Sequence, residues 1–192
     1  GFVIGVVIGL LVAGILHVVP FLRRALYPLL ILSQNIPVIA LGPLLIIWFG
    51  FGVTSKLIVI VLVCFFPVTV AALGGLAGTD RTMLNYMHMI GAKRGQIFWK
   101  LELPYSLPAV FSGLRIAATY SIMGAIIAEW ISSDKGLGYY MILQQSAFRT
   151  DRMFVAILIV IALSLVMFSL IVLLEHWCIR WQRKNHHEQG GH

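Results

Sequence analysis

A series of long apolar segments, separated by short polar ones, constrains the fold of this chain most strongly. The 192 residues are 60% hydrophobic and only 11% charged, with a mean hydropathy of +0.96. Soluble domains carry about 25% charged residues, so this chain has too few polar residues to cover a soluble globule of its size. A helix of about 20 apolar residues spans a bilayer, and the sequence lacks the alternating pattern of a membrane β-barrel. It therefore predicts an all-α polytopic membrane protein.

About five transmembrane helices are expected from the apolar segments. They cover residues 2–19, 26–49, 57–77, 109–128 and 154–177. We expect one transmembrane domain over residues 1–178, followed by a polar, disordered cytoplasmic tail over residues 179–192. Because the chain opens with Gly1 and is apolar from Phe2, we also expect that it is part of a longer protein whose N-terminal part is missing.

The distribution of basic residues predicts the topology. The net charge is +7, but Lys and Arg lie at loop ends and not on one face with aromatic residues, so no nucleic-acid partner is expected. Cytoplasmic loops collect Lys and Arg. If the loop with Arg23 and Arg24 is cytoplasmic, residues 79–108 and the C-terminus are cytoplasmic too, and ten of the 14 basic residues lie inside. His17 is expected at the membrane interface and Glu175 at a solvated helix end.

Two apolar segments contain features that bear on packing and transport. Gly5 and Gly9 lie four residues apart, a spacing that lets another membrane helix approach closely. Gln34 and Asn35 lie beside helix breakers within the second segment. Irregular backbone inside a membrane is tolerated where it is buried in protein or lines a cavity, so both residues are candidates for a pathway. The alternative is an interfacial amphipathic stretch followed by a short span that begins near Pro37.

Two charged residues near the ends of the fourth segment are further candidates for a pathway or a gate. Arg115 would line an inner vestibule or snorkel to the interface. Glu129 would gate the pathway, snorkel to water, or pair with Arg149 or Arg152. The sequence leaves each of these alternatives open.

The longest polar interval, residues 79–108, is predicted to form a helix–turn–helix elbow. Asp80, or the threonine before it, can cap the first helix. Gly91 fits a left-handed helix stop, and a second short helix over residues 94–101 would end at Pro104. Apolar positions at helical spacing are Met83, Leu84, Met87 and Ile90 in the first helix and Ile97, Phe98 and Leu101 in the second. The apolar face of the elbow is expected to pack on the span ends, and its Met-rich tip and basic flank to point to the cytoplasm.

The spacing within the elbow resembles a known signature. Gly91 is followed by nine residues and then by LELP, which resembles the signature of permease subunits of binding-protein-dependent ABC importers. That signature has a Glu-Ala-Ala triplet ahead of its glycine, whereas this chain has Asn85, Tyr86 and Met87 there. The stretches PLLIIWFGFG, FFPVTVAALGGL and GLGY also resemble permeases of the nitrate, sulfonate, taurine and thiamine-precursor importers.

The resemblance implies the type I ABC importer permease fold, about one further span on the N-terminal side, and a set of partners. Two permease subunits, expected to be a homodimer, would form a pathway across the bacterial inner membrane. The elbow would dock on a separate cytoplasmic ATP-binding subunit, and an extracytoplasmic solute-binding protein would deliver the substrate. The residues implied to couple to the ATPase are Asn85, Tyr86, Met87, His88, Gly91, Ala92, Lys93, Arg94, Leu103 and Pro104.

The chain itself is expected to be a transport subunit and not an enzyme. It contains no GxxxxGKS or GxxxxGKT phosphate loop, so ATP would bind to the partner subunit and no cofactor is expected here. The resemblance implies a small substrate such as a sulfonate, nitrate or a thiamine-related pyrimidine. The alternative function, a secondary transporter or channel, would need ionisable groups near the middle of the membrane, and the apolar segments have essentially none.

Overall fold

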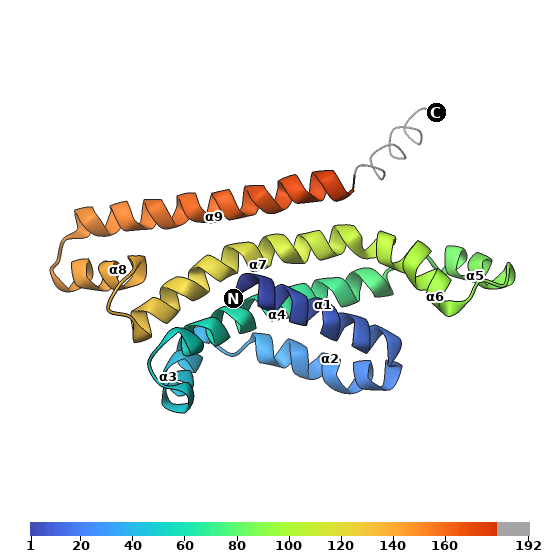
Figure 1. Ribbon diagram of the computed structural model, residues 1–192, viewed down its shortest axis with the longest axis horizontal. Coiled ribbons are helices and arrows are strands. Elements are labelled where there is room, and N and C mark those ends of the chain that lie inside the picture. The colour runs from blue at the N-terminus through green and yellow to red at the C-terminus, as the bar shows by residue number, and fades with distance from the viewer. Residues whose placement is uncertain (180–192) are drawn as a thin grey trace.

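The computed structural model describes residues 1–179, and every regular element in that range is a helix (Figure 1). In chain order the elements are α1 (Phe2–Val18), α2 (Pro20–Gln34), α3 (Val38–Phe49), α4 (Val53–Ala77), α5 (Arg81–Met89), α6 (Arg94–Ile97), the π-helical turn η1 (Phe98–Glu102), α7 (Leu103–Ser132), α8 (Leu137–Ser146) and α9 (Thr150–Cys178). The all-α prediction is confirmed. The expected tail lies outside the described residues, apart from Ile179.

Three helical stretches are long and apolar enough to cross a membrane: Val53–Ala77, Arg94–Ile131 and Thr150–Cys178. The α2–α3 pair is a candidate for a fourth crossing, although its two helices meet at a bend of 101°. α1 is a shorter apolar helix of 17 residues. Each of the predicted apolar segments therefore corresponds to helical structure, and the chain is a multi-pass membrane protein.

The second predicted segment is the one that the structure divides. α2 ends at Gln34, and α3 begins only at Val38. Pro37 has no N–H with which to continue α2, and a proline disfavours helical geometry at the residue before it. The irregular backbone is thus confirmed, and the start of α3 agrees with a short span that begins near Pro37. A role of this break in lining a pathway stays a prediction.

α4 and α7 form the centre of the molecule and run antiparallel (Figure 1). A Cβ atom added to Gly113 of α7 would lie 2.9 Å from the Pro67 carbonyl oxygen of α4. One added to Gly75 of α4 would lie 3.0 Å from the Ser106 carbonyl oxygen of α7. Backbone atoms in a packed interior cannot move aside for a new side chain, so the two helices need glycine at both positions to approach this closely.

α1 packs on α4 through the glycine spacing seen in the sequence. A Cβ atom on Gly5 would lie 2.8 Å from the Val61 carbonyl oxygen, and one on Gly9 would lie 3.1 Å from the Phe65 carbonyl oxygen. The Thr69 hydroxyl donates across the same seam to the Gly9 carbonyl oxygen at 3.2 Å. The prediction of close helix packing is confirmed, and α1 is held firmly against the centre of the molecule.

The segments that connect the helices lie mainly at the two ends of the molecule (Figure 1). α5, α6, the α1–α2 junction and the last turns of α9 lie at the end that we name the elbow end. α3, α8 and the first turns of α4 lie at the opposite end, which we name the α8 end. α8 itself was not expected from the sequence. α9 buries only Ala156 and Ile171 among its residues, and α2 buries none, so both helices present apolar surface outward.

Candidate functional site

The first helix of the elbow begins with one of the two predicted caps. The Asp80 Oδ1 accepts a hydrogen bond from the Thr82 N–H at 2.7 Å, and its negative charge is favourable at the positive end of the helix dipole. Thr79 is buried, and its hydroxyl donates to the Leu76 carbonyl oxygen at 3.1 Å. Asp80 therefore caps α5, while Thr79 closes the end of α4.

α5 ends at the predicted left-handed glycine. Gly91 has a φ of +75°, which glycine adopts at little cost. The Gly91 N–H donates to the His88 carbonyl oxygen and the Ala92 N–H to the Met87 carbonyl oxygen, both at 3.0 Å. This pair of bonds is the Schellman pattern of helix termination. The turn is therefore hydrogen-bonded, and it fixes the angle between the two arms of the elbow.

The second arm of the elbow is longer than predicted. It starts after Lys93, whose N–H donates to the Gln96 Oε1 at 2.9 Å, and it runs through η1 into α7 without a break. The prediction that Pro104 ends this helix is wrong. In η1 the backbone hydrogen bonds reach back five residues and not four, as in the bond from the Leu103 N–H to the Phe98 carbonyl oxygen. Pro104, which has no N–H to donate, then falls in the first turn of α7, where proline is tolerated.

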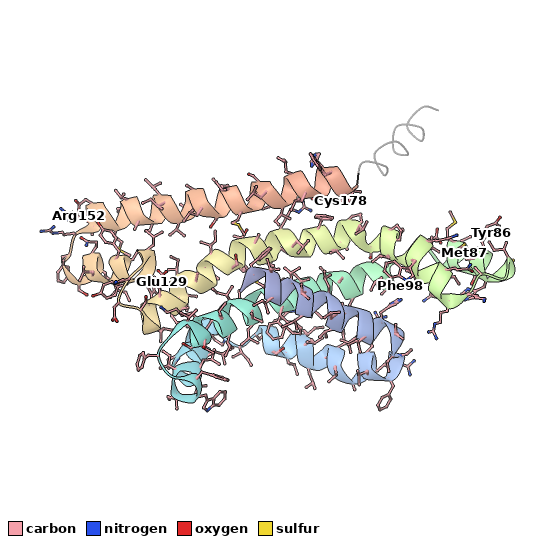
Figure 2. All side chains as sticks on the ribbon, viewed as in Figure 1. Tyr86, Met87, Phe98, Glu129, Arg152 and Cys178 are labelled. Carbon is pink, nitrogen blue, oxygen red and sulfur yellow. The ribbon has the colours of Figure 1, made fainter. Side chains whose placement is uncertain are left out.

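The tip of the elbow exposes large apolar side chains at the far end of the molecule (Figure 2). α5 buries none of its residues. The exposed apolar side chains of this tip are Met83, Tyr86, Met89 and Ile90. The prediction that Met83 and Ile90 pack on the span ends is wrong, whereas Ile97 of the second arm is buried as predicted. Flexible methionine and aromatic side chains make a surface that adapts to another protein.

The ten predicted coupling residues divide into two groups by exposure. The exposed group comprises Asn85, Tyr86, His88, Gly91, Lys93 and Arg94. The half-buried group comprises Met87, Ala92, Leu103 and Pro104. Residues of the first group are accessible to a partner, and those of the second group lie where they shape the turn and its junction with α7.

Of the four candidate pathway residues, Asn35 and Arg115 have local or lateral partners. Gln34 and Asn35 are exposed at the end of α2, where the Asn35 Nδ2 donates to the Ile31 carbonyl oxygen at 3.1 Å. The Arg115 Nη1 lies 3.4 Å from the Glu175 Oε2, so an ion pair joins α7 to α9. The prediction that Glu175 belongs to a solvated helix end is wrong, because its half-buried carboxylate faces α7.

Glu129, the fourth candidate, lies at the α8 end and holds the start of α8 (Figure 2). Its Oε2 accepts a hydrogen bond from the Gly138 N–H at 2.7 Å. A Cβ atom on Gly138 would lie 2.9 Å from the Glu129 Cβ, and one on Gly136, which has a φ of +120°, would meet the carboxylate. Within residues 1–179 no ion pair includes Glu129, so the alternative of a pair with Arg149 or Arg152 is wrong.

One contact between distant residues has no signal in the sequence. The His17 Nε2 donates to the Glu102 Oε2 at 2.9 Å, although 85 residues separate the two. His17 lies in the last turn of α1, and Glu102 is the last residue of η1. A lone histidine in an otherwise apolar segment was the one available hint, and it did not identify the partner.

Comparison with known proteins shows the family to which this chain belongs. Residues 5–180 match the family of binding-protein-dependent transport system inner membrane components, and the chain belongs to that family. It is therefore a permease subunit of a binding-protein-dependent ABC importer, as the sequence predicted.

Three relatives match most of this chain, and the names of two of them specify a solute. A formylaminopyrimidine transport permease of Halalkalibacterium halodurans is 37% identical over 184 residues, which are 96% of this chain and 74% of that protein. A probable ABC transporter permease of Haemophilus influenzae is 39% identical over 176 residues, 92% of this chain and 72% of its own length. A putative aliphatic sulfonates transport permease of Bacillus subtilis is 31% identical over 185 residues, 95% of this chain and 66% of its own length.

Proposed function

We propose that this permease subunit forms the translocation pathway of an ATP-driven importer and that its elbow docks on a separate cytoplasmic ATP-binding subunit. The observation that carries the proposal is the exposed apolar tip of α5 at the far end of the molecule. Burial of this tip in a cleft of the partner would remove apolar surface from water, the main favourable term in most protein association. Lys93 and Arg94, exposed beside the tip, would lie at the polar rim of such a contact.

The continuity of the helices supports a route from the elbow into the membrane. The capped start of α5 follows α4 closely, and the second arm continues into α7. α4 and α7 are packed against each other through Gly75 and Gly113. A displacement of the elbow by the ATPase would therefore move the two central helices together, and the pathway would open alternately to the two sides of the membrane.

The proposal includes the partners expected from the sequence. A second permease subunit, forming a homodimer, would cover part of the apolar surface that α2 and α9 present outward, with lipid against the rest. Arg23 and Arg24 lie in the first turns of α2 at the elbow end (Figure 1), which supports a cytoplasmic elbow. A solute-binding protein would then deliver substrate at the α8 end. ATP would be bound and hydrolysed by the partner, and this chain would hold no cofactor.

The proposed substrate is a small organic or inorganic solute. Formylaminopyrimidine and aliphatic sulfonates are the solutes named for two relatives, and nitrate is a further small anion expected from the sequence. The charged side chains Arg115 and Glu175 are paired with each other between α7 and α9. This arrangement supports a permease in which the solute-binding protein, and not a charged site within the spans, supplies most of the selectivity.

Copurification tests the docking proposal. The permease is co-expressed with a tagged ATP-binding subunit of its importer, and Met89→Glu is compared with Phe51→Glu. The two side chains are similarly exposed, 83% and 81%, but Phe51 lies between α3 and α4 at the α8 end. Loss of an interface anchor costs about 2 kcal/mol or more, so we expect Met89→Glu to retain roughly a tenth or less of the ATPase. Phe51→Glu should retain all of it.

Two results would refute the proposal in different ways. If both variants bring down the ATPase as well as the unmodified permease does, α5 is not the docking surface. If solute uptake into cells persists when the ATP-binding subunit is deleted, the import is not driven by ATP.

A further inference from the structure

The contact between His17 and Glu102 joins the end of α1 to the base of the elbow. The two side chains are each 17% exposed, and the Nε2–Oε2 distance is 2.9 Å. The imidazole donates this hydrogen bond in its charged form and in its Nε2-protonated neutral form. The contact is therefore directional and largely shielded from solvent, unlike an ion pair between flexible surface side chains.

η1 holds the imidazole with two side chains from its opposite ends. Glu102 accepts the hydrogen bond, and the Phe98 ring packs against the His17 ring with 6.0 Å between the ring centroids. Ile97, the residue immediately before this turn, is buried. π-helical turns are rare and often occur at functional positions. Here the irregular turn brings a carboxylate and an aromatic ring to one side chain of α1.

The other two histidines within residues 1–179 make no comparable contact between helices. The His88 Nδ1 lies 2.8 Å from the carbonyl oxygen of Leu84, and the His176 Nδ1 lies 2.9 Å from that of Val172. Both are exposed and bond to their own helices. Within residues 1–179, His17 is thus the histidine that joins two helices, and His176 offers a matched control.

The position of α1 gives this contact a consequence for transport. α1 is packed on α4 through Gly5 and Gly9, and its last residue is separated from α2 only by Val19. α2 ends at Gln34 and leads to the break before α3, which contains Asn35; both are candidate pathway residues. α1 therefore lies between the elbow and the broken helix pair.

We propose that the His17–Glu102 contact is a coupling latch, in which His17 acts as a positioning residue. It makes α1, and through α1 the broken pair α2–α3, follow the movement of the elbow. This inference rests on the proposed docking of the elbow on the ATPase. Without the latch, the ATPase still binds and moves the elbow, but a smaller share of its cycles reorients the pathway.

The test uses the full importer, with both permease subunits and the ATPase, in proteoliposomes supplied with the solute-binding protein. The measured quantity is ATP hydrolysed per solute molecule taken up. Residues that carry coupling typically change the coupling between two sites by about 2- to 30-fold, so we expect the ratio to rise roughly threefold or more in His17→Ala and in Glu102→Ala. The double variant should be no worse than the single ones. His17→Gln, whose amide can donate to Glu102, should restore most of the coupling, and His176→Ala should leave the ratio unchanged.

The outcomes that overturn the latch are distinct from failure of the proposed function. An unchanged ratio in His17→Ala, with an intact and stable complex, overturns it. A second result also overturns the latch: His17→Ala loses ATP hydrolysis and uptake in parallel, its melting temperature falls, and His17→Gln does not restore them. That pattern would indicate a purely structural contact. Uptake by the unmodified importer without ATP would instead refute the proposed function itself.

Discussion

Replacing Glu129 by alanine tests how the start of α8 is held. The Glu129 carboxylate accepts the Gly138 N–H at 2.7 Å, and Gly138 lies in the first turn of α8. The first N–H groups of a helix have no partner within the helix, so Glu129 supplies one from α7. Its negative charge also lies at the favourable end of the α8 dipole. The substitution should therefore loosen α8 without disturbing the packing of α4 on α7.

The size of the effect follows from this single contact. A hydrogen bond to a charged group contributes about 1.5–3 kcal/mol, and a value near 2 kcal/mol corresponds to an increase of about 30-fold in local opening. Hydrogen–deuterium exchange followed by mass spectrometry, on the protein in nanodiscs, measures this opening in peptides that cover α8. Peptides from the middle of α4 should exchange at their original rate.

A second substitution separates the charge from the hydrogen bond. Glu129→Gln keeps an oxygen that can accept from the Gly138 N–H but removes the charge, so we expect about a fivefold increase in exchange, between the two extremes. Equal exchange of α8 in the unmodified protein and in Glu129→Ala would refute the reasoning, because the start of the helix would then be held by other contacts.

Two further predictions concern the packing of the spans. In Gly113→Leu the new side chain meets backbone of α4, so we expect a loss of about 1–3 kcal/mol of stability, measured as a lower thermal midpoint in detergent. Gly14→Leu, at a position with open space within 4 Å, is the control, and equal midpoints would contradict the close approach. Arg115→Ala leaves the Glu175 carboxylate unpaired, so we expect a lower midpoint that adding Glu175→Ala partly restores. A double variant that loses as much as both single variants together would argue against the ion pair.

The elements that the sequence predicted well are those whose causes lie within a few residues. Asp80 caps α5 because its carboxylate reaches an N–H two residues further on. Gly91 stops α5 because its left-handed backbone is a local property of glycine. The apolar segments became helices because a helix satisfies its own backbone hydrogen bonds in lipid. Each of these outcomes depends on local chemistry and not on the arrangement of the spans.

The elements that could not be predicted depend on how distant helices align. The His17–Glu102 contact joins residues 85 positions apart, and the pairing of Arg115 with Glu175 depends on how α9 aligns along α7. Pro104 misled the prediction because the π-helical turn before it has no signature in the sequence. The family match supports the class of protein, while these contacts come from the structure alone.

In the proposed mechanism, the unbroken helix from the second arm of the elbow through α7 would act as a lever. It covers Arg94–Ile131, 38 residues, and is therefore about 57 Å long at 1.5 Å per residue. Gly113, where α7 closely approaches the backbone of α4, is near its midpoint, and a tilt that α4 and α7 make together would turn around this point. A tilt of about 10° around that point would carry each end through about 5 Å, in opposite directions. A modest pull at the elbow would thus shift the α8 end by about the width of a small solute, without any change in the fold of α7.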